Sequence, residues 1–481
     1  MSTPIPANRA RVDALEVATA TGGHVVRNQG GRTATGIVTD SRVLTPGNAF
    51  VALRGPTHDG HVYVDAAISA GAVLVVVERG RAPADERADV VEVDDTLSAL
   101  GALAHAHLVS WRAAQPSARV VAITGSAGKT TTKELCAALL RTAGLCHATR
   151  GNLNNRVGVP AVVFGIEPRH AFAVLELGMS QPGEIAALGA LVQPDVAVVT
   201  NVGLAHAGGV GGSIADVARE KGDLFKSTRA GGVAVANAED DSVMGELRRA
   251  RCARTVTFGT GPSADYRVEA RRTLDDGRSI VTLRRPGREP ISVHLRLAGE
   301  AAAVDCAAAF AAAEAATEGP IQDEGARDAL LDVGSIPGRM QVRRLQRGIR
   351  VLDDSYNANP TSVRASLATL SELAAARRVA VLGEMKEIGP AAEKEHEAMG
   401  AVVAAAGVEL LVSCGGLSSR IAESAARLGV SVIVTSSARE AADAVLAAIQ
   451  PNDTVLVKAS RSVGAECVVE ALVVMHHEDP T

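Results

Sequence analysis

Short runs of aliphatic and β-branched residues alternate along most of the chain with segments of helix-like periodicity. In the middle of the chain, apolar runs at residues 120–124, 172–177, 196–201 and 232–237 are each followed by a segment of helical character. Such alternation of strand and helix is typical of a parallel, doubly wound sheet. We therefore predict an α/β fold with a mostly parallel central sheet.

The alternation is interrupted twice, which divides the chain into three blocks. The chain has 481 residues, more than one hydrophobic core usually serves. We predict a small N-terminal α/β domain over 1–115, a central domain over 116–336 and a C-terminal Rossmann-like domain over 337–481. The last of these begins after an Ile-Pro-Gly sequence and again alternates strands with helices.

One segment of the central block has a different pattern. Residues 266–297 alternate apolar and charged positions around Asp-Gly and Pro-Gly turns, which predicts antiparallel hairpins. An alanine-rich stretch at about 300–318 follows. Because alanine has the highest helix propensity, we interpret this stretch as an ordinary helix rather than as low-complexity sequence.

Composition excludes several classes of protein. The chain is 47% hydrophobic but only 2% aromatic, and 49 basic residues against 54 acidic ones give a net charge of −5. No basic tract could follow a nucleic-acid backbone, so nucleic acid is not an expected partner. The N-terminus has no apolar core of signal-peptide length, no uninterrupted apolar run is long enough to span a membrane, and the six scattered cysteines are expected to be reduced packing residues. We expect a cytoplasmic protein.

The segment RVVAITGSAGKTTTKE at 119–134 has the features of a phosphate-binding loop. A β-branched strand leads into a glycine loop, and a helix follows at once, so backbone N–H groups and the helix dipole would attract an anion. Lys129 would add charge at the terminal phosphates, and Thr130 a hydroxyl for Mg²⁺. The spacing is shorter than the usual G-x-x-x-x-G-K-[ST]. The strand and helix around the loop favour a P-loop-type central sheet.

Two residues with metal-binding side chains follow strands of the same block. Glu176 ends one apolar strand and His206 follows another. Residues beyond the carboxyl ends of parallel strands meet at the ligand-binding crevice, so both should face the phosphate loop. A carboxylate and an imidazole there would suit a divalent cation that bridges phosphates. A histidine in a loop could equally be only solvated or hydrogen-bonded.

Other polar residues have two interpretations on the sequence alone. Asn152, Asn154 and Asn155 could simply form a turn, and on composition that interpretation is the better one. Lys221 lies on a helix among apolar residues and could be an ordinary solvated lysine.

In the third block, Asp353 and Asp354 follow a strand, and Asn357 lies in the loop beyond it. These carboxylates could bind ribose hydroxyls or an ammonium group, or could only cap a turn. Arg339 lies at the predicted boundary between the second and third blocks. It could form an ion pair between domains or bring a positive charge to the γ-phosphate when the domains close.

Taken in order, eleven segments resemble the Mur ligases of peptidoglycan synthesis. They are TDSR, HDGH, TGSAGKTTTKE, GNLNNRVGVP, ELGMSQPGEI, TNVGLAH, EKGDLF, IPGRM, DDSYNANP, VLGEMKEIG and KASR. The resemblance covers nearly the whole chain. Within the family, DDSYNANP and VLGEMKEIG best match the ligases that act on D-alanyl-D-alanine.

The resemblance implies an ATP-dependent amide ligase with ATP and Mg²⁺ as cofactors. Its substrates would be UDP-N-acetylmuramoyl-tripeptide and D-alanyl-D-alanine, joined through an acyl phosphate, and the protein would act as a cytoplasmic monomer. A sister ligase with another amino-acid substrate, such as a polyglutamate or muramoyl-tripeptide synthetase, is an alternative that DDSYNANP disfavours.

The resemblance also implies roles for individual residues. The UDP end of the substrate would contact Thr39, Asp40, Ser41, Arg42, Asp59, Gly60 and His61. ATP would contact Gly125, Ser126, Ala127, Gly128, Lys129, Thr130 and Thr131. The Mg²⁺ ligands would be Thr130, Glu176, His206 and Lys221, the last as a carbamate. The substrate-side loop would contain Asn152, Asn154 and Asn155, and the nucleotide and dipeptide contacts of the third domain would be Arg339, Asp353, Asp354, Tyr356 and Asn357.

The chain departs from the family at the predicted adenine site. Relatives have G-x-H-N-x-x-N after the hairpins, whereas here Ala301, Ala302 and Asp305 stand in place of the histidine and the two asparagines. An asparagine can donate to adenine N7 and accept from N6, but an ionised aspartate can only accept. We therefore expect half of the base contact to be lost, which also leaves a non-catalytic nucleotide or precursor-binding protein as an alternative function.

Two further departures are local. Gly208 stands two residues after His206, where relatives often have glutamate, and KASRSVGAE replaces a more glycine-rich C-terminal motif. Neither change touches the predicted phosphate and metal residues.

Overall fold

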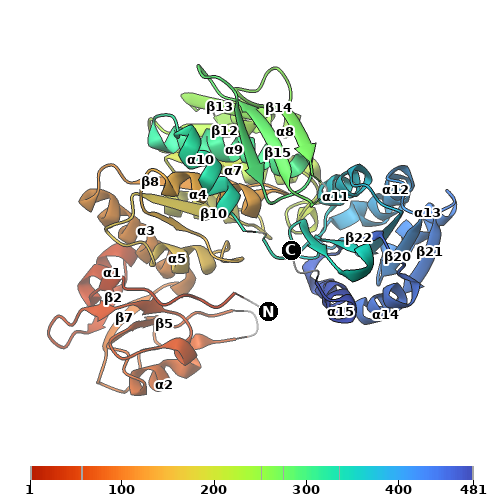
Figure 1. The fold of residues 1–481 in the computed structure, drawn as a ribbon. Helices are drawn as coiled ribbons and strands as arrows, with labels where there is room; N and C mark the ends of the chain where they lie inside the picture. The colour runs from red at the N-terminus through yellow and green to blue at the C-terminus, as the bar shows by residue number, and fades with distance from the viewer. Residues whose placement is uncertain (1–2, 56–57, 251, 275, 335, 479–481) are drawn as a thin grey trace.

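The computed structural model describes residues 3–55, 58–250, 252–274, 276–334 and 336–478. Three masses, each with its own main sheet, follow one another from the N-terminus to the C-terminus (Figure 1). The predicted α/β fold with mostly parallel sheets is confirmed.

The N-terminal mass contains a five-stranded sheet in the order β2–β7–β6–β5–β4. Neighbours from β4 to β7 are parallel, and β2 is antiparallel to β7. A separate ribbon pairs β1 with β3. The strands are β1 (Arg11–Val12), β2 (His24–Arg27), β3 (Ala34–Thr35), β4 (Ile37–Val38), β5 (Ala49–Val51), β6 (Leu74–Glu78) and β7 (Asp89–Val93); the helices are α1 (Ala14–Thr21), α2 (Val64–Ser69) and the 3₁₀ turns η1 (Ser41–Val43) and η2 (Gly60–Tyr63).

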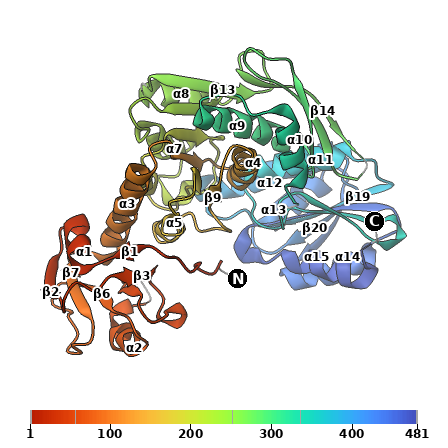
Figure 2. The ribbon, with the colours of Figure 1, turned by 60° about the vertical axis from the view of Figure 1, so that its left-hand side comes forward.

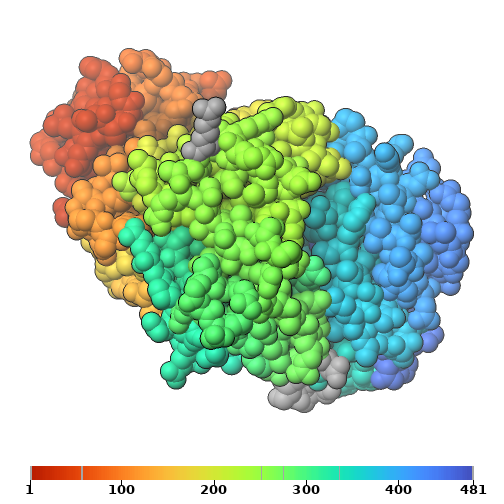
Figure 3. Space-filling view, turned by 90° about the horizontal axis from the view of Figure 1, so that it is seen from above, coloured from red at the N-terminus to blue at the C-terminus, as the bar shows by residue number. Residues whose placement is uncertain are grey.

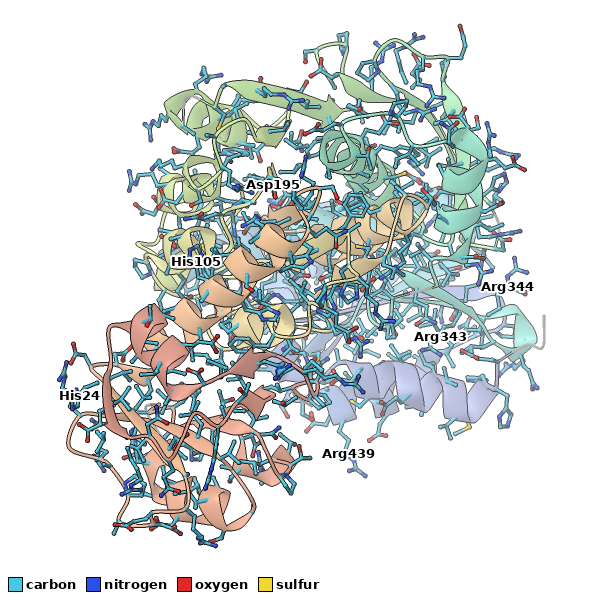
Figure 4. All side chains as sticks on the ribbon, turned by 90° about the vertical axis from the view of Figure 1, so that its left-hand side faces the viewer. His24, His105, Asp195, Arg343, Arg344 and Arg439 are labelled. Atoms are coloured by element: carbon cyan, nitrogen blue, oxygen red, sulfur yellow. The ribbon has the colours of Figure 1, made fainter. Side chains whose placement is uncertain are left out.

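Helix α3 (Thr96–Ala114) connects the first mass to the second. It contacts α1 on one side and α5 and α6 on the other, and Figure 2 shows it between the two masses. Two of its side chains reach the central part. His105 Nδ1 lies 2.8 Å from the carbonyl oxygen of Leu191, and Arg112 lies 3.1 Å from Asp195 (Figure 4). The predicted boundary at residue 115 therefore falls after a helix that both masses share.

The central mass contains a nine-stranded sheet in the order β16–β15–β14–β13–β12–β11–β8–β10–β9. Pairs from β9 to β14 are parallel, and β14, β15 and β16 are antiparallel. The predicted hairpins thus exist, but they extend the same sheet. The strands are β8 (Arg119–Thr124), β9 (Cys146–Ala148), β10 (Phe172–Glu176), β11 (Val196–Val199), β12 (Val233–Asn237), β13 (Arg254–Gly259), β14 (Tyr266–Thr273), β15 (Ser279–Arg284) and β16 (Ile291–Leu295).

Helices cover both faces of this sheet, which explains why its central strands are apolar on both sides. Val121 and Ile123 pack with α4 and α9, whereas Ala122 packs with the opposite set. Twelve residues of α9 are buried, and its many alanines let the helix approach the sheet closely. The helices are α4 (Lys129–Arg141), α5 (Gly158–Val163), α6 (Glu184–Val192), η3 (Ala207–Gly209), α7 (Ile214–Lys226), α8 (Asp241–Ala250), α9 (Glu300–Thr317) and α10 (Asp323–Asp332).

The C-terminal mass contains a six-stranded sheet in the order β17–β18–β22–β19–β20–β21. All neighbouring strands are parallel except β17, which is antiparallel to β18. The elements are β17 (Gln341–Arg344), η4 (Gln346–Gly348), β18 (Arg350–Asp353), α11 (Pro360–Glu372), β19 (Arg377–Gly383), η5 (Gly389–Ala391), α12 (Ala392–Ala405), β20 (Leu410–Cys414), α13 (Ser418–Ala426), β21 (Ser431–Thr435), α14 (Ala438–Ala448), β22 (Asp453–Lys458), η6 (Arg461–Val463) and α15 (Glu466–His476).

The central and C-terminal masses touch along a seam, seen from above between the green and blue surfaces of Figure 3. Arg271 of β14 makes two hydrogen bonds to the Glu372 carboxylate of α11, at 2.7 and 2.6 Å. On the other side of the seam, Gly208 N donates to the Glu387 carbonyl at 3.0 Å. These contacts hold the third mass against the carboxyl ends of the central strands.

Two expectations from composition concern the described part of the chain. The cysteines are free, and burial raises the pKa of the Cys136, Cys146, Cys306 and Cys414 thiols, as expected of packing residues. Within the described ranges, no helix combines the length and apolar character needed to cross a bilayer.

Candidate active site

A cavity of about 510 Å³ lies between the central and C-terminal masses. The central part contributes the loop after β8 and the start of α4, and the C-terminal part contributes α11 along its length with residues at the ends of β18 and β22. Predicted site residues that line it are Ser126, Ala127, Gly128, Lys129, Thr130, Thr131, Asp305, Arg339, Asp354 and Asn357, together with Ala301 and Ala302. The structure therefore brings residues from two of the predicted domains to one cavity.

The phosphate loop has the expected shape, but only part of its backbone is available for an anion. Gly128 directly precedes α4 and has φ 82°, a left-handed conformation that favours glycine. The N–H groups of Ser126 and Ala127 already donate to Asn201, at 3.0 Å to its carbonyl and 2.8 Å to its side-chain oxygen. The N–H groups of residues 128–131 have no hydrogen-bond acceptor in the described part of the chain and are free to bind phosphate.

Lys129 lies at the first turn of α4. Its Nζ donates to the Gly125 carbonyl at 2.7 Å, so the side chain folds back over the loop. Removal from water lowers the pKa of the Lys129 ammonium, while the nearby Glu176 carboxylate opposes this shift. A phosphate group at the loop would supply the counter-charge that the ammonium lacks.

Glu176 is the last residue of β10 and is 2% exposed. Thr130 Oγ1 donates to one carboxylate oxygen at 2.9 Å, and Asn154 Nδ2 donates to the other at 2.7 Å. The backbone N–H of Glu176 donates to Thr149 Oγ1 at 3.0 Å. Carboxylate and hydroxyl oxygens are the ligands that Mg²⁺ prefers, so this pair fits the predicted metal.

The other two predicted metal-site residues do not contact Glu176 in this structure. His206 has φ 63°, and its Nδ1 lies 2.5 Å from Oε2 of Glu387 in the C-terminal mass. Lys221 on α7 is 1% exposed, so the interpretation as a solvated lysine is wrong. In the described part of the chain Lys221 has no hydrogen bond or ion pair, and burial together with Lys129 holds its pKa well below the usual value.

No group of three or more His, Cys, Asp or Glu side chains gathers as a metal cluster within the described ranges. The candidate site instead combines one carboxylate with a hydroxyl. Such a sparse ligand set is usual for Mg²⁺, which keeps several waters and takes oxygens from bound phosphates.

Arg339 joins the two walls of the cavity. Its guanidinium lies 4.1 Å from the centre of the Tyr356 ring and 3.4 Å from Thr130 Oγ1. Arg461 lies 5.1 Å from the same ring. The predicted interdomain charge is therefore in contact with the phosphate loop, and Tyr356 orients it by a cation–π contact.

Asp354 forms a buried ion pair with Lys458, at 2.5 Å. Ser366 also donates to the Asp354 carboxylate, and the Asn357 carbonyl accepts from Lys458 at 3.0 Å. Burial lowers the pKa of Lys458, and Asp354 opposes that shift. The neighbouring Asp353 accepts from Ser355 and shapes the turn.

Asp305 on α9 reaches the phosphate loop. Thr132 Oγ1 donates to it at 3.2 Å, and burial raises the pKa of its carboxyl to about 8. Ala301 and Ala302 lie one turn earlier and line the same cavity with small side chains.

The three predicted asparagines have different environments. Asn154 holds Glu176, whereas the Asn155 side chain accepts from the N–H groups of Val157 and Gly158 and so fixes the start of α5. The backbone N–H of Asn152 donates to Thr3 at 3.3 Å. Asn155 thus has the contacts of a turn residue.

The predicted UDP contacts lie in the N-terminal mass, and none of them lines the cavity. Residues 39–42 follow β4, and the Asp40 carboxylate bonds the Arg42 guanidinium, which lowers the pKa of Asp40. His61 Nε2 accepts from the Glu78 N–H at 2.9 Å, and its Nδ1 faces Asp59 at 2.6 Å. A Cβ on Gly60 would lie 2.7 Å from the Leu53 carbonyl oxygen. The turn at residues 59–61 is therefore held against the segment after β5 and the end of β6.

Sequence reasoning assigned no role to three residues of the site, although they lie in the KASR, TNVGLAH and VLGEMKEIG segments. Lys458 is the last residue of the buried strand β22. Glu176 was selected because it ends a parallel strand, and the same reasoning applies to Lys458. Asn201, two residues beyond the end of β11, holds the phosphate loop. Glu387 lies in the VLGEMKEIG segment, but the sequence did not show its contact with His206, which lies 181 residues away in the chain.

Comparison with known proteins agrees with this arrangement. Family models for the Mur ligase family catalytic domain, the Mur ligase middle domain and the Mur ligase glutamate ligase domain match residues 33–108, 123–313 and 338–461. Two relatives are named UDP-N-acetylmuramoyl-tripeptide–D-alanyl-D-alanine ligase. That of Escherichia coli is 36% identical and that of Bacillus subtilis 32% identical, and each alignment covers 91% of this chain and 93% of the relative.

Solved structures give the same result. MurF from Acinetobacter baumannii superimposes with a TM-score of 0.86 at 29% identity, over 98% of this chain and all of that one. MurF ligase from Thermotoga maritima in complex with ADP gives 0.78 at 28% identity, over 91% of this chain and 96% of that one. The chain belongs to the Mur ligase family.

Proposed function

We propose that this protein is an ATP-dependent ligase that joins D-alanyl-D-alanine to UDP-N-acetylmuramoyl-tripeptide. The proposal rests on one observation: the Arg339 guanidinium donates a hydrogen bond to the Thr130 hydroxyl, and this hydroxyl donates to the Glu176 carboxylate. The Arg339 guanidinium thus lies beside a hydroxyl and a carboxylate that could hold a metal at bound phosphates.

The substrate pair is supported by the relatives, because alignments with them cover nearly the full length of both chains. The ADP complex of the Thermotoga maritima structure supports a nucleotide at the phosphate loop. In this chain, the N–H groups of residues 128–131 and the Lys129 ammonium would hold the phosphates.

Mg²⁺ would bind Thr130 and Glu176, whose oxygens suit a hard cation, with His206 at the edge of the site. When bound, it would neutralise charge on the phosphates and so favour attack by an anion.

Lys221 is proposed to carry a carbamate. A buried, neutral amine is nucleophilic: its nitrogen would form a bond to the carbon of CO₂ and lose a proton, which gives an anion in place of a cation. Burial, the lack of a partner in the described part of the chain and the lowered pKa support this proposal.

The reaction would then run in two steps. A carboxylate oxygen of the tripeptide attacks the γ-phosphorus, the bond to the β-phosphate oxygen breaks, and ADP leaves; Lys129 and Arg339 stabilise the charge on the transferred group. The neutral amine of D-alanyl-D-alanine then attacks the acyl carbon, inorganic phosphate leaves, and the nitrogen loses a proton. Contacts such as that between Arg271 and Glu372 would keep water away from the acyl phosphate.

The remaining assignments belong to the same proposal. The N-terminal domain (1–115) would hold the UDP end through residues 39–42 and 59–61, and the central (116–336) and C-terminal (337–481) domains would close on ATP. Asn152 and Asn154 would face the peptide, and Tyr356 and Asn357 the dipeptide and nucleotide. The enzyme would act as a monomer.

The test is a phosphate-release assay with ATP, Mg²⁺, UDP-N-acetylmuramoyl-tripeptide and D-alanyl-D-alanine. Phosphate should appear only when both acceptors are present. Phosphate release that does not depend on D-alanyl-D-alanine would contradict the proposed reaction. Use of another amino acid in place of the dipeptide would identify a sister ligase.

A non-catalytic binding protein of the same fold would behave differently. Such a protein would bind precursor equally well after Lys129→Ala, whereas in the proposed ligase this change should weaken ATP binding in calorimetry. The Thr130 and Glu176 contact favours the ligase, since binding a precursor alone does not require it.

A further inference from the structure

Asp305 is a buried carboxyl group that forms no ion pair with any described residue. It is 7% exposed, and its one hydrogen bond in the described part of the chain comes from the neutral hydroxyl of Thr132, to Oδ1. Oδ2 has no donor there. A Cβ on Gly128 would collide with Oδ1, so the carboxyl lies directly against the backbone of the phosphate loop.

The charged groups around Asp305 are engaged elsewhere. From α4, Lys129 donates to the Gly125 carbonyl. Arg339 stacks on Tyr356, and among the described residues it is the cation whose charge favours ionisation of Asp305. Most other charged groups that line the cavity have partners of their own. Asp354 pairs with Lys458, Arg364 with Glu395 and Glu372 with Arg271. Glu239 accepts from the Thr260 N–H, and Glu300 lies on the same helix as Asp305.

An ionised carboxylate in this position would be costly for two reasons. It would be removed from water without an ion pair, which favours the protonated form. It would also lie beside the N–H groups of residues 128–131, where nucleotide phosphates are proposed to bind, and like charges at close range disfavour each other. Burial already raises the pKa of Asp305 to about 8 without any phosphate present.

We propose that Asp305 is a neutral carboxylic acid whenever nucleotide is bound, so that nucleotide binding at pH 9 takes up close to one proton at this side chain. The inference deepens the proposed function and rests on its nucleotide site. The proton comes from solvent and forms an O–H bond at the carboxyl group; no other bond changes. A neutral acid also keeps a hydrogen-bond donor in the cavity wall, which an ionised aspartate would lack.

The experiment measures ADP binding by calorimetry at pH 7 and pH 9, in buffers of different ionisation enthalpy and without Mg²⁺. The proteins are the wild type and Asp305→Asn, which preserves shape and cannot ionise. If only the protonated form binds ADP, the affinity of the wild type relative to Asp305→Asn should fall about tenfold between the two pH values. At pH 9 the wild type should take up nearly one proton more than the variant. Glu300→Gln, which removes another carboxylate of the same helix and the same cavity, should leave the proton uptake unchanged.

Equal proton uptake by the wild type and Asp305→Asn, or an affinity ratio that does not change with pH, would overturn the inference and leave the nucleotide site standing. No ADP binding by the wild type at pH 7 would overturn both. Infrared spectroscopy of the wild type gives a second test that needs no variant. A band from a protonated carboxyl should disappear on titration from pH 7 to pH 9 and return when ADP is added, and its absence at pH 7 would also overturn the inference.

Discussion

Thr130 Oγ1 donates to Glu176 Oε2 at 2.9 Å, and this hydrogen bond ties the first turn of α4 to the end of β10. Asn154 holds the other carboxylate oxygen at 2.7 Å. The carboxylate is therefore oriented by two neutral donors before any ligand binds. Such supporting contacts commonly decide how well a metal-binding carboxylate works.

Asn154→Ala should reduce activity without unfolding the protein. It removes a hydrogen bond to a charged group worth about 1.5–3 kcal/mol, so kcat/KM for the proposed ligation should fall roughly 10- to 100-fold. Asn155→Ala is the matched control, because this side chain accepts from the Val157 and Gly158 N–H groups in the turn before α5 and does not contact Glu176. The control should lower thermal stability by about 1 kcal/mol and reduce activity less. Equal activities for the two variants would contradict the role given to Asn154.

Lys458→Met should destabilise the protein strongly, because it leaves the Asp354 carboxylate buried without its partner at 2.5 Å. Breaking a buried ion pair from one side costs about 3–5 kcal/mol. The double variant Asp354→Asn with Lys458→Met should recover part of this loss. The unfolding midpoints of the wild type, both single variants and the double variant give the coupling free energy between Asp354 and Lys458. Strictly additive effects would show that the two groups do not interact.

Gly208→Ala should weaken the contact between the central and C-terminal masses. A Cβ there would lie 3.1 Å from the Gly389 backbone, which cannot move as a side chain would. We expect roughly tenfold lower activity and a more open shape in small-angle scattering, from an overpacking cost of about 1–3 kcal/mol. Gly245→Ala in α8 is the control, since a Cβ there meets nothing within 4 Å. That change should stabilise the helix by about 0.5–1 kcal/mol.

Asp305→Asn should raise thermal stability in a pH-dependent way. Burial raises the pKa of Asp305 from 3.8 to about 8, so between these values the native protein holds a proton that the unfolded chain has lost. Because the unfolded state binds fewer protons, the free energy of unfolding of the wild type falls as pH rises through this window. The advantage of the variant in melting temperature should grow from pH 4 to pH 8 and then level off. A difference that stays constant over this range would show that Asp305 is ionised in the native protein.

Lys221→Met should abolish ligation almost completely, by at least a hundredfold, if the side chain carries a metal-binding carbamate. Lys226→Met on the same helix should change activity less than about twofold, because Lys226 is exposed and its one ion pair within the described ranges is with Asp223. With ¹³C-labelled bicarbonate, a carbamate signal should be present in the wild type and in Lys226→Met but absent in Lys221→Met. A signal that persists in Lys221→Met would place the carbamate elsewhere.

Much of the fold could be predicted because local sequence carries it. The apolar runs at 120–124 and 196–201 became β8 and β11, and the alanine-rich stretch became α9. Glu176 was predicted as a site residue because it ends a strand, and in the structure its carboxylate accepts a hydrogen bond from Thr130. Long-range contacts could not be predicted in this way. Nothing near Asn201 in the chain shows that it binds the loop after β8.

The sequence by itself determined the strands, the helices, the phosphate loop and the family, because each depends on residues close together in the chain. Only the tertiary structure decided the chemical state of the polar side chains. Lys221 could have been solvated, and burial among apolar residues made it a lysine with a strongly lowered pKa. By sequence alone, Asp305 replaces an asparagine and is expected to remove a hydrogen-bond donor. In the structure, burial favours the protonated carboxyl group, which can donate. Charge state follows from how much water and which partners surround a group, and folding alone sets both.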